Sequence, residues 1–270
     1  MTPAVDLFGD DIGPTPLCTA SSNGHMSVVR YLVERGADID KARATSVTPV
    51  YGAAGKGYLM VVQYLVEQGA DKEKATEDGL TPLHQAALEG HLAVIRYLVE
   101  NGADKEKVTN GKGCTPLLVA VQNGHLAVVR FLVEQGVDKD KARNSGATPL
   151  FIAVEKGHVA VVQYLVEQGA DTDKAMNNGV TPLYVAAQKG YVAVVRCLVE
   201  QGAEKDKAAD DGCTPLLIAA CNGHVAAVRY LVQQGADKNK AMNTDITPLR
   251  VALLKGHAEM AAYLLAAGAR

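Results

Sequence analysis

Apolar and polar positions recur along the chain in blocks of about 33 residues, and each block has the same internal order. In the third block Thr81 precedes Pro82, the pair expected where a helix begins. Threonine caps free backbone N–H groups, and proline needs no N–H at the first helical position. Apolar residues within 94–99 then fall on one helical stripe. The pattern predicts two short helices, 82–89 and 92–101, followed by a polar loop.

Three motifs repeat in phase through the sequence. The dipeptide Thr-Pro begins at Thr15, Thr48, Thr81, Thr115, Thr148, Thr181, Thr214 and Thr247. Glycine before His or Tyr lies at Gly24, Gly57, Gly90, Gly124, Gly157, Gly190, Gly223 and Gly256. Gly-Ala-Asp or a close variant begins at Gly36, Gly69, Gly102, Gly136, Gly169, Gly202, Gly235 and Gly268. One step is 34 residues long, and its extra residue lies in the loop 108–113. Since no unit can bury its apolar stripe alone, we expect the units to stack.

The stretch 78–91, Asp-Gly-Leu-Thr-Pro-Leu-His-Gln-Ala-Ala-Leu-Glu-Gly-His, closely resembles the motif of the ankyrin repeat family. The resemblance covers nearly the whole chain. It implies an all-α repeat solenoid of helix-turn-helix units, with β-hairpin-like finger loops and a concave face made of fingertips and first helices. After an N-terminal tail at 1–9, we expect one solenoid over 10–270. Its units are expected at 10–42, 43–75, 76–108, 110–142, 143–175, 176–208, 209–241 and 242–270.

Several residues depart from the family pattern. The motif Thr-Pro-Leu-His is whole only at Thr81–His84, so the Thr–His hydrogen bond typical of the family is expected in that unit alone. Ser46 and Asp245 replace the turn glycine, which predicts differently shaped fingers in the second and eighth units.

The two end units should act as caps, and a cap needs a polar outer face. Thr19, Ser21, Ser22 and Asn23 give the first unit that character. The last unit carries Leu253, Leu254, Met260 and Leu265, which predicts exposed apolar surface there. We expect a monomer, with an end-to-end contact through this last unit as the alternative.

Composition excludes several classes of protein. The 27 Lys and Arg residues against 30 Asp and Glu give a net charge of −3, which disfavours nucleic-acid binding. No apolar run approaches the roughly 18 residues of a membrane span, and the N-terminus lacks the basic and apolar regions of a secretory signal. Five cysteines without a Cys-x-x-Cys pair fit reduced thiols in an intracellular protein, cytoplasmic or nuclear.

The residues that suggest a metal site or a phosphate-binding loop are better explained by structural roles. Six of the seven histidines share one repeat position, and stacked helices lie roughly 8–10 Å apart, so these rings cannot converge on one zinc ion. The remaining one, His84, is the motif histidine. Gly111-Lys112-Gly113 lacks the complete phosphate-loop pattern. We therefore predict no enzyme activity, no metal and no cofactor.

Two other ladders are also expected to be structural. Aromatic residues in the second helices are expected to pack between repeats; they are Tyr31, Tyr64, Tyr97, Phe131, Tyr164, Tyr230 and Tyr263. An acidic residue (Asn239 in one unit) precedes a lysine at each junction between units, and these pairs are expected to form a solvated ladder with weak pairing across repeats.

Against this uniform frame, the fingertips and the ends of the first helices vary. The resemblance implies that such positions bind partners. The candidate positions are Glu77, Asp78, Leu88, Glu89, Lys112, Gln122, Asn123, Asn144, Ser145, Glu155, Lys156, Asn177, Asn178, Gln188, Lys189, Asp210, Asp211 and Asn222. The predicted function is a non-catalytic scaffold for a protein or peptide partner. The alternatives are an engineered or consensus-like scaffold, or a segment of a larger protein, with no partner of its own.

Overall fold

The computed structural model describes residues 13–42 and 46–270, and within them the chain forms 16 helices and no strand. The predicted tail at 1–9 lies outside the described residues. The chain divides into two compact units, residues 1–138 and 139–270. The two are described separately, and a single solenoid over 10–270 stays a prediction.

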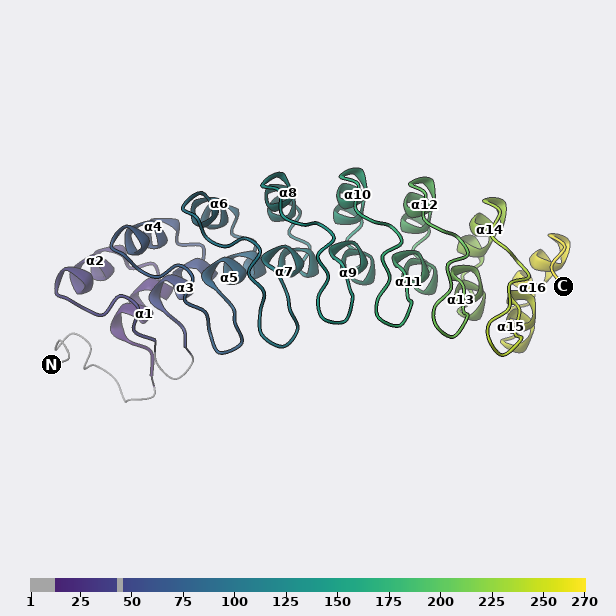
Figure 1. Cartoon of the computed structure of the whole chain (residues 1–270), viewed down its shortest axis with the longest axis horizontal. Helices are drawn as coiled ribbons and strands as arrows, with labels where there is room; N and C mark the ends of the chain where they lie inside the picture. The colour runs from purple at the N-terminus through teal and green to yellow at the C-terminus, as the bar shows by residue number, and fades with distance from the viewer. Residues whose placement is uncertain (1–12, 43–45) are drawn as a thin grey trace. The chain divides into compact units, whose positions relative to one another are not determined.

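Each unit is a stack of helix pairs, with the first helices in one layer and the second helices in another (Figure 1). The N-terminal unit contains α1 (Pro16–Ser22), α2 (Met26–Glu34), α3 (Pro49–Gly55), α4 (Leu59–Glu67), α5 (Pro82–Glu89), α6 (Leu92–Glu100), α7 (Pro116–Gln122) and α8 (Leu126–Glu134). The C-terminal unit contains α9 (Pro149–Lys156), α10 (Val159–Glu167), α11 (Pro182–Lys189), α12 (Val192–Glu200), α13 (Pro215–Cys221), α14 (Val225–Gln233), α15 (Pro248–Leu254) and α16 (Ala258–Ala266).

The Thr-Pro dipeptide begins each first helix, as predicted. In α5, Thr81 Oγ1 accepts a hydrogen bond from the backbone N–H of His84, and Pro82 occupies the first turn. The same threonine cap recurs in every first helix from Thr15 to Thr247. Because the cap satisfies a backbone donor that has no partner in the helix, it fixes the start of the helix by sequence alone.

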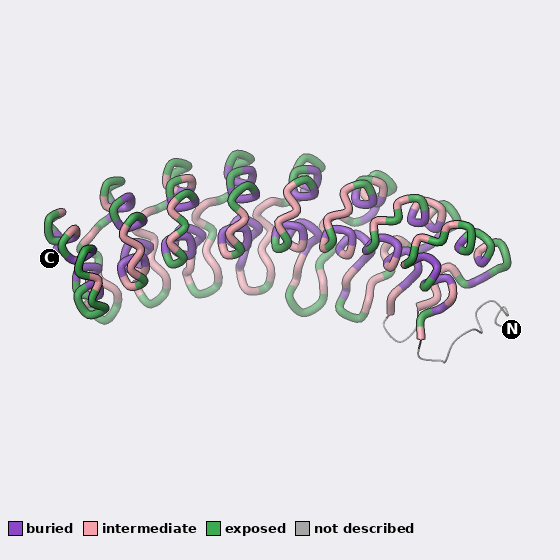
Figure 2. The backbone as a smooth tube through the Cα atoms, turned by 180° about the vertical axis from the view of Figure 1, so that it is seen from behind, coloured by how far each residue is buried: buried purple, intermediate pink, exposed green. Residues whose placement is uncertain are grey.

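Burial separates the two layers (Figure 2). The first helices are buried over most of their length; in α5, Leu83, Ala86 and Ala87 are at most 1% exposed. The second helices bury one stripe, such as Val94, Ile95 and Leu98 in α6. The predicted stripe is therefore confirmed, and the opposite side of each second helix faces solvent.

A finger is the loop between a second helix and the next first helix, and its tip closes on itself by a backbone hydrogen bond. The third finger (76–80) joins Thr76 N–H to Leu80 O at 3.0 Å, and the seventh (209–213) joins Ala209 N–H to Cys213 O at 3.0 Å. The fourth, fifth, sixth and eighth fingers are 109–114, 143–147, 176–180 and 242–246, closed in the same manner. The fingers are hairpin-like turns without strand pairing among the described residues.

The expected distortion of the eighth finger is wrong. Asp245 has φ +58°, the left-handed conformation of the glycine it replaces, and Met242 N–H still bonds Ile246 O at 3.1 Å. Ser46 likewise has φ +54°; the rest of that fingertip, residues 43–45, lies outside the described residues.

The end units differ from expectation at one residue each. Ser21, predicted to give the first unit a polar outer face, is 0% exposed. In the last unit Leu253, Leu254 and Leu265 are 60%, 69% and 57% exposed, as predicted, but Met260 is fully buried. An end-to-end contact through the three exposed leucines stays a prediction.

Candidate partner-binding surface

Asparagine side chains fix the fingertips to one another within each unit. Asn110 donates from its backbone N–H to Asp78 O and from its amide Nδ2 to Glu77 O, both at 2.8 Å. Asn177 makes the equivalent bonds to Ser145 O and Asn144 O, both at 3.1 Å. Consecutive fingers therefore have fixed positions. The amide of Asn177, predicted to face a partner, is part of this frame.

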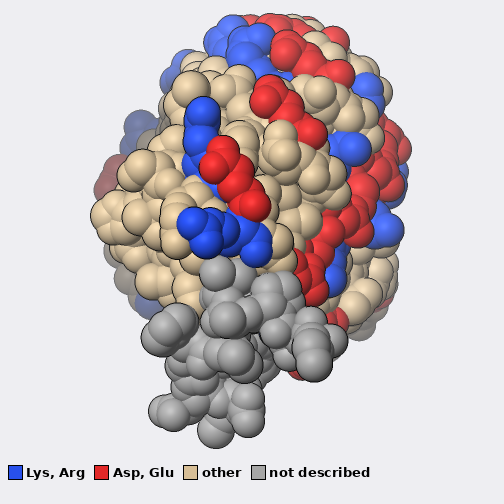
Figure 3. All heavy atoms as spheres, turned by 90° about the vertical axis from the view of Figure 1, so that its left-hand side faces the viewer, with Lys and Arg blue, Asp and Glu red and all other residues tan. Residues whose placement is uncertain are grey.

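The junctions between repeats are hydrogen-bonded more closely than predicted. The Asp40 carboxylate accepts the backbone N–H of Asp71 at 3.0 Å, and the Lys74 amino group donates to Asp40 O at 2.8 Å. The same pair of bonds recurs where Asp206 meets Asp237 and Lys240. These bonds are solvent-exposed, and the charged groups of the ladder bond mainly to the backbone of the neighbouring repeat. Acidic and basic side chains are intermingled on the surface seen in Figure 3.

The shared-position histidines also connect neighbouring repeats. His91 Nε2 bonds Gly55 O at 3.2 Å, and His125 Nε2 bonds Leu88 O at 2.9 Å. His224 and His257 make the equivalent bonds to Gln188 O and Cys221 O. The predicted structural role is confirmed at these positions, and each bond fixes the end of the preceding first helix.

Several aromatic residues of the second helices contact the neighbouring repeat, as predicted. Tyr31 does not follow the prediction, because it is 53% exposed and its ring lies 5.0 Å from the guanidinium of Arg35 in its own repeat. The guanidinium of Arg96 lies 4.6 Å from the ring centre of Phe131 in the next repeat, and Arg196 lies 4.7 Å from that of Tyr230. Tyr97 Oη donates to Gln63 O at 3.4 Å. These rings therefore act in packing.

On this frame the candidate partner-binding residues lie at the surface. All are exposed except Leu88, Ser145 and Glu155, which are half-buried. Some have structural bonds: Asn222 Nδ2 donates to Gln188 O at 3.0 Å, and the Asp211 carboxylate accepts Cys213 N–H at 2.9 Å. In each unit, we call the fingertips and first-helix ends together the finger face.

Four of the candidate residues meet in one cavity of the N-terminal unit. The cavity measures about 480 Å³ and lies between the third and fourth fingers and the ends of α5 and α7. Its lining residues are Asp78, Leu80, Leu88, Thr109, Asn110, Gly111, Lys112, Cys114, Val119 and Gln122. Leu80, Cys114 and Val119 were not among the candidates, although the extra residue in the fourth finger marks this place in the sequence.

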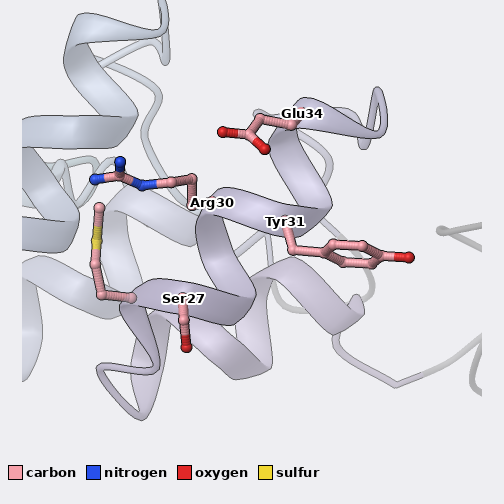
Figure 4. Close-up of a pocket in the computed structure, with 5 residues that line it drawn as sticks. Ser27, Arg30, Tyr31 and Glu34 are labelled. Carbon is pink, nitrogen blue, oxygen red and sulfur yellow. The ribbon is translucent and has the colours of Figure 1, made fainter.

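In the C-terminal unit, Lys156 borders a smaller hollow of about 310 Å³ with Tyr191. A third hollow of about 480 Å³ lies along α2, lined by Met26, Ser27, Arg30, Tyr31 and Glu34. Arg30 and Tyr31 point in opposite directions there (Figure 4). Side chains that diverge in this way cannot act together on one bound group.

The titratable side chains with shifted pKa values give little support for catalysis. Burial raises the pKa of the Cys213 thiol to about 11, and burial also raises the pKa of Tyr184 beside it. A thiol with so high a pKa is a poor nucleophile at neutral pH. Across residues 13–42 and 46–270, no His, Cys, Asp and Glu side chains cluster as metal ligands would. No helix in this part of the chain has the length and apolar character to cross a bilayer.

Comparison with known proteins agrees with the fold. A family model of three ankyrin repeats matches residues 4–76, 53–143, 135–209 and 204–270. The structure is similar to the human ASB11 ankyrin repeat domain, with TM-score 0.74, 27% identity and coverage of 82% of this chain and 97% of that one. It is similar also to the ankyrin repeat domain of Bcl-3, a member of the IkappaB family, with TM-score 0.73, 29% identity and coverage of 82% and 99%.

A search of curated proteins found no match to this sequence. The family model nevertheless extends over almost the entire chain, and the threonine caps, paired helices and finger loops agree with it. This chain belongs to the ankyrin repeat family.

Proposed function

We propose that the chain is a non-catalytic scaffold that binds a protein or peptide partner on its finger face. Ankyrin repeat domains are generally protein–protein interaction modules. The observation that carries the proposal is the contrast between frame and surface. Side chains that join repeats recur from unit to unit, whereas exposed fingertip and helix-end side chains change in charge and size.

The ordered backbone of the fingers also favours binding at this surface. The third finger is hydrogen-bonded to the fourth, and the fifth to eighth fingers are bonded in succession, so a partner would meet side chains whose backbone is already ordered. Binding to such a surface loses little conformational entropy on the scaffold side. Three lysines, Lys112, Lys156 and Lys189, are exposed on the finger face. Within the described residues, their amino groups form no hydrogen bond or ion pair.

The proposal includes an intracellular location and a monomeric scaffold that needs no cofactor. Its five cysteines form no disulfide, and two of them are buried, which suits a reducing compartment. Light scattering should give the mass of one chain, 28.4 kDa. A doubled mass would contradict the monomer and direct attention to the exposed leucines of the last repeat.

The test is an affinity pull-down with mass spectrometry on three forms of the whole chain. One is wild type, and one carries Lys112→Glu, Lys156→Glu and Lys189→Glu. The matched control carries Lys72→Glu, Lys205→Glu and Lys238→Glu at the junctions between repeats, so both variants change the net charge equally. Circular dichroism checks that all three are folded.

We expect at least one protein that wild type and the junction control retain and the finger-face variant loses. Equal recovery by all three forms, or loss with both variants, would contradict binding at the finger face.

A further inference from the structure

The fourth finger is built differently from the others. Its closing hydrogen bond joins Thr109 N–H to Cys114 O at 3.0 Å, five positions apart, whereas the third and seventh fingers close over four. Two left-handed glycines, Gly111 at φ +71° and Gly113 at φ +67°, accommodate the added residue. Positive φ is easy only for glycine, so this finger has its own local backbone path.

This longer finger is held at both ends by the third repeat. At its tip, Asn110 bonds Glu77 O and Asp78 O. At its base, the imidazole Nε2 of His84 donates to Cys114 O at 3.1 Å. Since neither end can shift, the extra residue displaces the loop between them, and the cavity of about 480 Å³ lies there.

The cavity has an apolar floor. Leu80, Leu88 and Val119 are all half-buried and all line it. A volume of this size lies within the range of about 300–1,000 Å³ typical of ligand pockets. An aliphatic side chain placed against this floor would remove apolar surface from water, which is the favourable term in most associations.

The rim around the floor is more acidic than basic. Asp78 on the third finger and Lys112 on the fourth are the charged residues that line the cavity. Two further exposed carboxylates, Glu77 and Glu89, directly adjoin the lining residues Asp78 and Leu88 in the chain. A partner with a basic residue beside its apolar one would complement this rim, since opposite charges steer association and fix orientation.

We propose that the cavity beneath the lengthened fourth finger is the specificity pocket of the finger face, and that it binds an aliphatic side chain flanked by a basic residue in a partner polypeptide. This inference rests on the proposed function and adds to it the chemistry of the partner segment.

Methyl NMR of the whole chain tests the pocket directly. The protein is labelled at Leu and Val methyl groups and titrated with three acetylated tripeptide amides, Arg-Leu-Gly, Arg-Ser-Gly and Glu-Leu-Gly, each up to about 5 mM, a range that detects millimolar affinity. The methyl groups of Leu80, Leu88 and Val119 should shift with Arg-Leu-Gly. The apparent affinity should be about tenfold lower for Arg-Ser-Gly, which lacks the apolar group, and about threefold lower for Glu-Leu-Gly.

Three variants separate the parts of the proposal. Deleting Gly111 restores the four-residue closure and should abolish the shifts. Asp78→Asn should reduce the preference for arginine over glutamate and keep the preference for leucine over serine. Glu134→Gln, the same charge change on α8 away from the cavity, should alter neither.

Absence of shifts at the three floor residues, or equal shifts with leucine and serine peptides, would overturn the pocket. A partner that still depends on Lys112, Lys156 and Lys189 in the pull-down would then leave the finger-face function standing without it. If no such partner exists but the methyl groups respond as expected, the pocket stands and the finger-face function fails.

Discussion

Individual polar residues in this chain fall into two groups, those that satisfy backbone groups and those that face solvent. Ser21 belongs to neither. It is fully buried in α1, and within the described residues its hydroxyl Oγ has no hydrogen-bond partner. Most other repeats have alanine at this position, as at Ala54 and Ala87, both 0% exposed. Ser21 therefore carries the cost of desolvating a hydroxyl without a compensating bond.

We predict that Ser21→Ala stabilises the protein. The control is Ser27→Ala on α2, where the serine is exposed and only helix propensity changes. The unfolding free energy from urea denaturation should rise by about 1 kcal/mol more for Ser21→Ala than for the control. An equal or smaller gain at Ser21 would show that its hydroxyl is satisfied in solution.

His84 is the second residue whose burial has a measurable consequence. Burial lowers the pKa of its imidazole below the usual 6.5, although its bond to Cys114 O acts in the opposite direction. Its other ring nitrogen, Nδ1, lies 2.9 Å from Thr81 Oγ1. With Nε2 donating to a carbonyl, the neutral ring satisfies both neighbours.

This lowered pKa predicts a pH-dependent stability. Because the unfolded chain binds a proton at His84 before the folded chain does, the stabilisation is complete above about pH 6.5 and falls as the pH decreases towards the folded pKa, by at most about 1.4 kcal/mol per pH unit. The variant His84→Leu, with the residue found at Leu118 and Leu217, should lose less stability between pH 7.5 and 5.5. Parallel profiles for the two proteins would exclude His84 as the source.

One of these two residue-level features could be predicted from the sequence, and the other could not. The Thr81–His84 bond followed from a complete motif. The burial of Ser21 did not, because a serine in a short end helix is compatible with either surface or interior. The packing of the helices decides whether this serine is buried, and a single short helix in the sequence does not reveal that packing.

At the scale of elements, the fingers are ordered structures rather than passive connections. The side-chain amide of Asn177 donates to the carbonyl of Asn144 in the finger before it. The side-chain oxygen of the neighbouring Asn178 instead accepts Val180 N–H at 3.3 Å, within its own turn. Two adjacent asparagines therefore have different roles, one joining fingers and one facing outward.

We predict different costs for removing these two side chains. Asn177→Ala should lower the unfolding free energy by about 1 kcal/mol, the usual value of one hydrogen bond, and Asn178→Ala by less than half of that. Chemical denaturation of the two single variants measures the difference. Equal effects would mean that the finger-to-finger bond contributes nothing to stability.

The bounds of the first helices were predictable because each of them starts with a threonine cap and proline, and the end of each described helix lies near a glycine. The left-handed turn at Asp245 was not, since aspartate adopts that conformation less readily than glycine and the neighbouring bonds have to hold it there. The cavity under the fourth finger was also missed. An inserted residue marks the place, but only the two fixed ends of that loop show that it leaves space.

At the scale of the whole molecule, each compact unit is built from contacts between neighbouring repeats. Histidine, asparagine, acidic residues and arginine form such contacts at many of the junctions, so stability is expected to accumulate from repeat to repeat. The same regularity explains why the sequence identifies the family so clearly and the partner so poorly. Residues that define the fold recur, and residues that would select a partner vary.

The most direct test of this division is the affinity of a protein captured by wild type, measured by titration against the purified chain and its two triple-lysine variants. The account predicts that changing Lys112, Lys156 and Lys189 to Glu weakens binding by at least about tenfold, or 1.4 kcal/mol, while the junction control binds as wild type does. Equal affinities of all three proteins would contradict the claim that the finger face binds the partner.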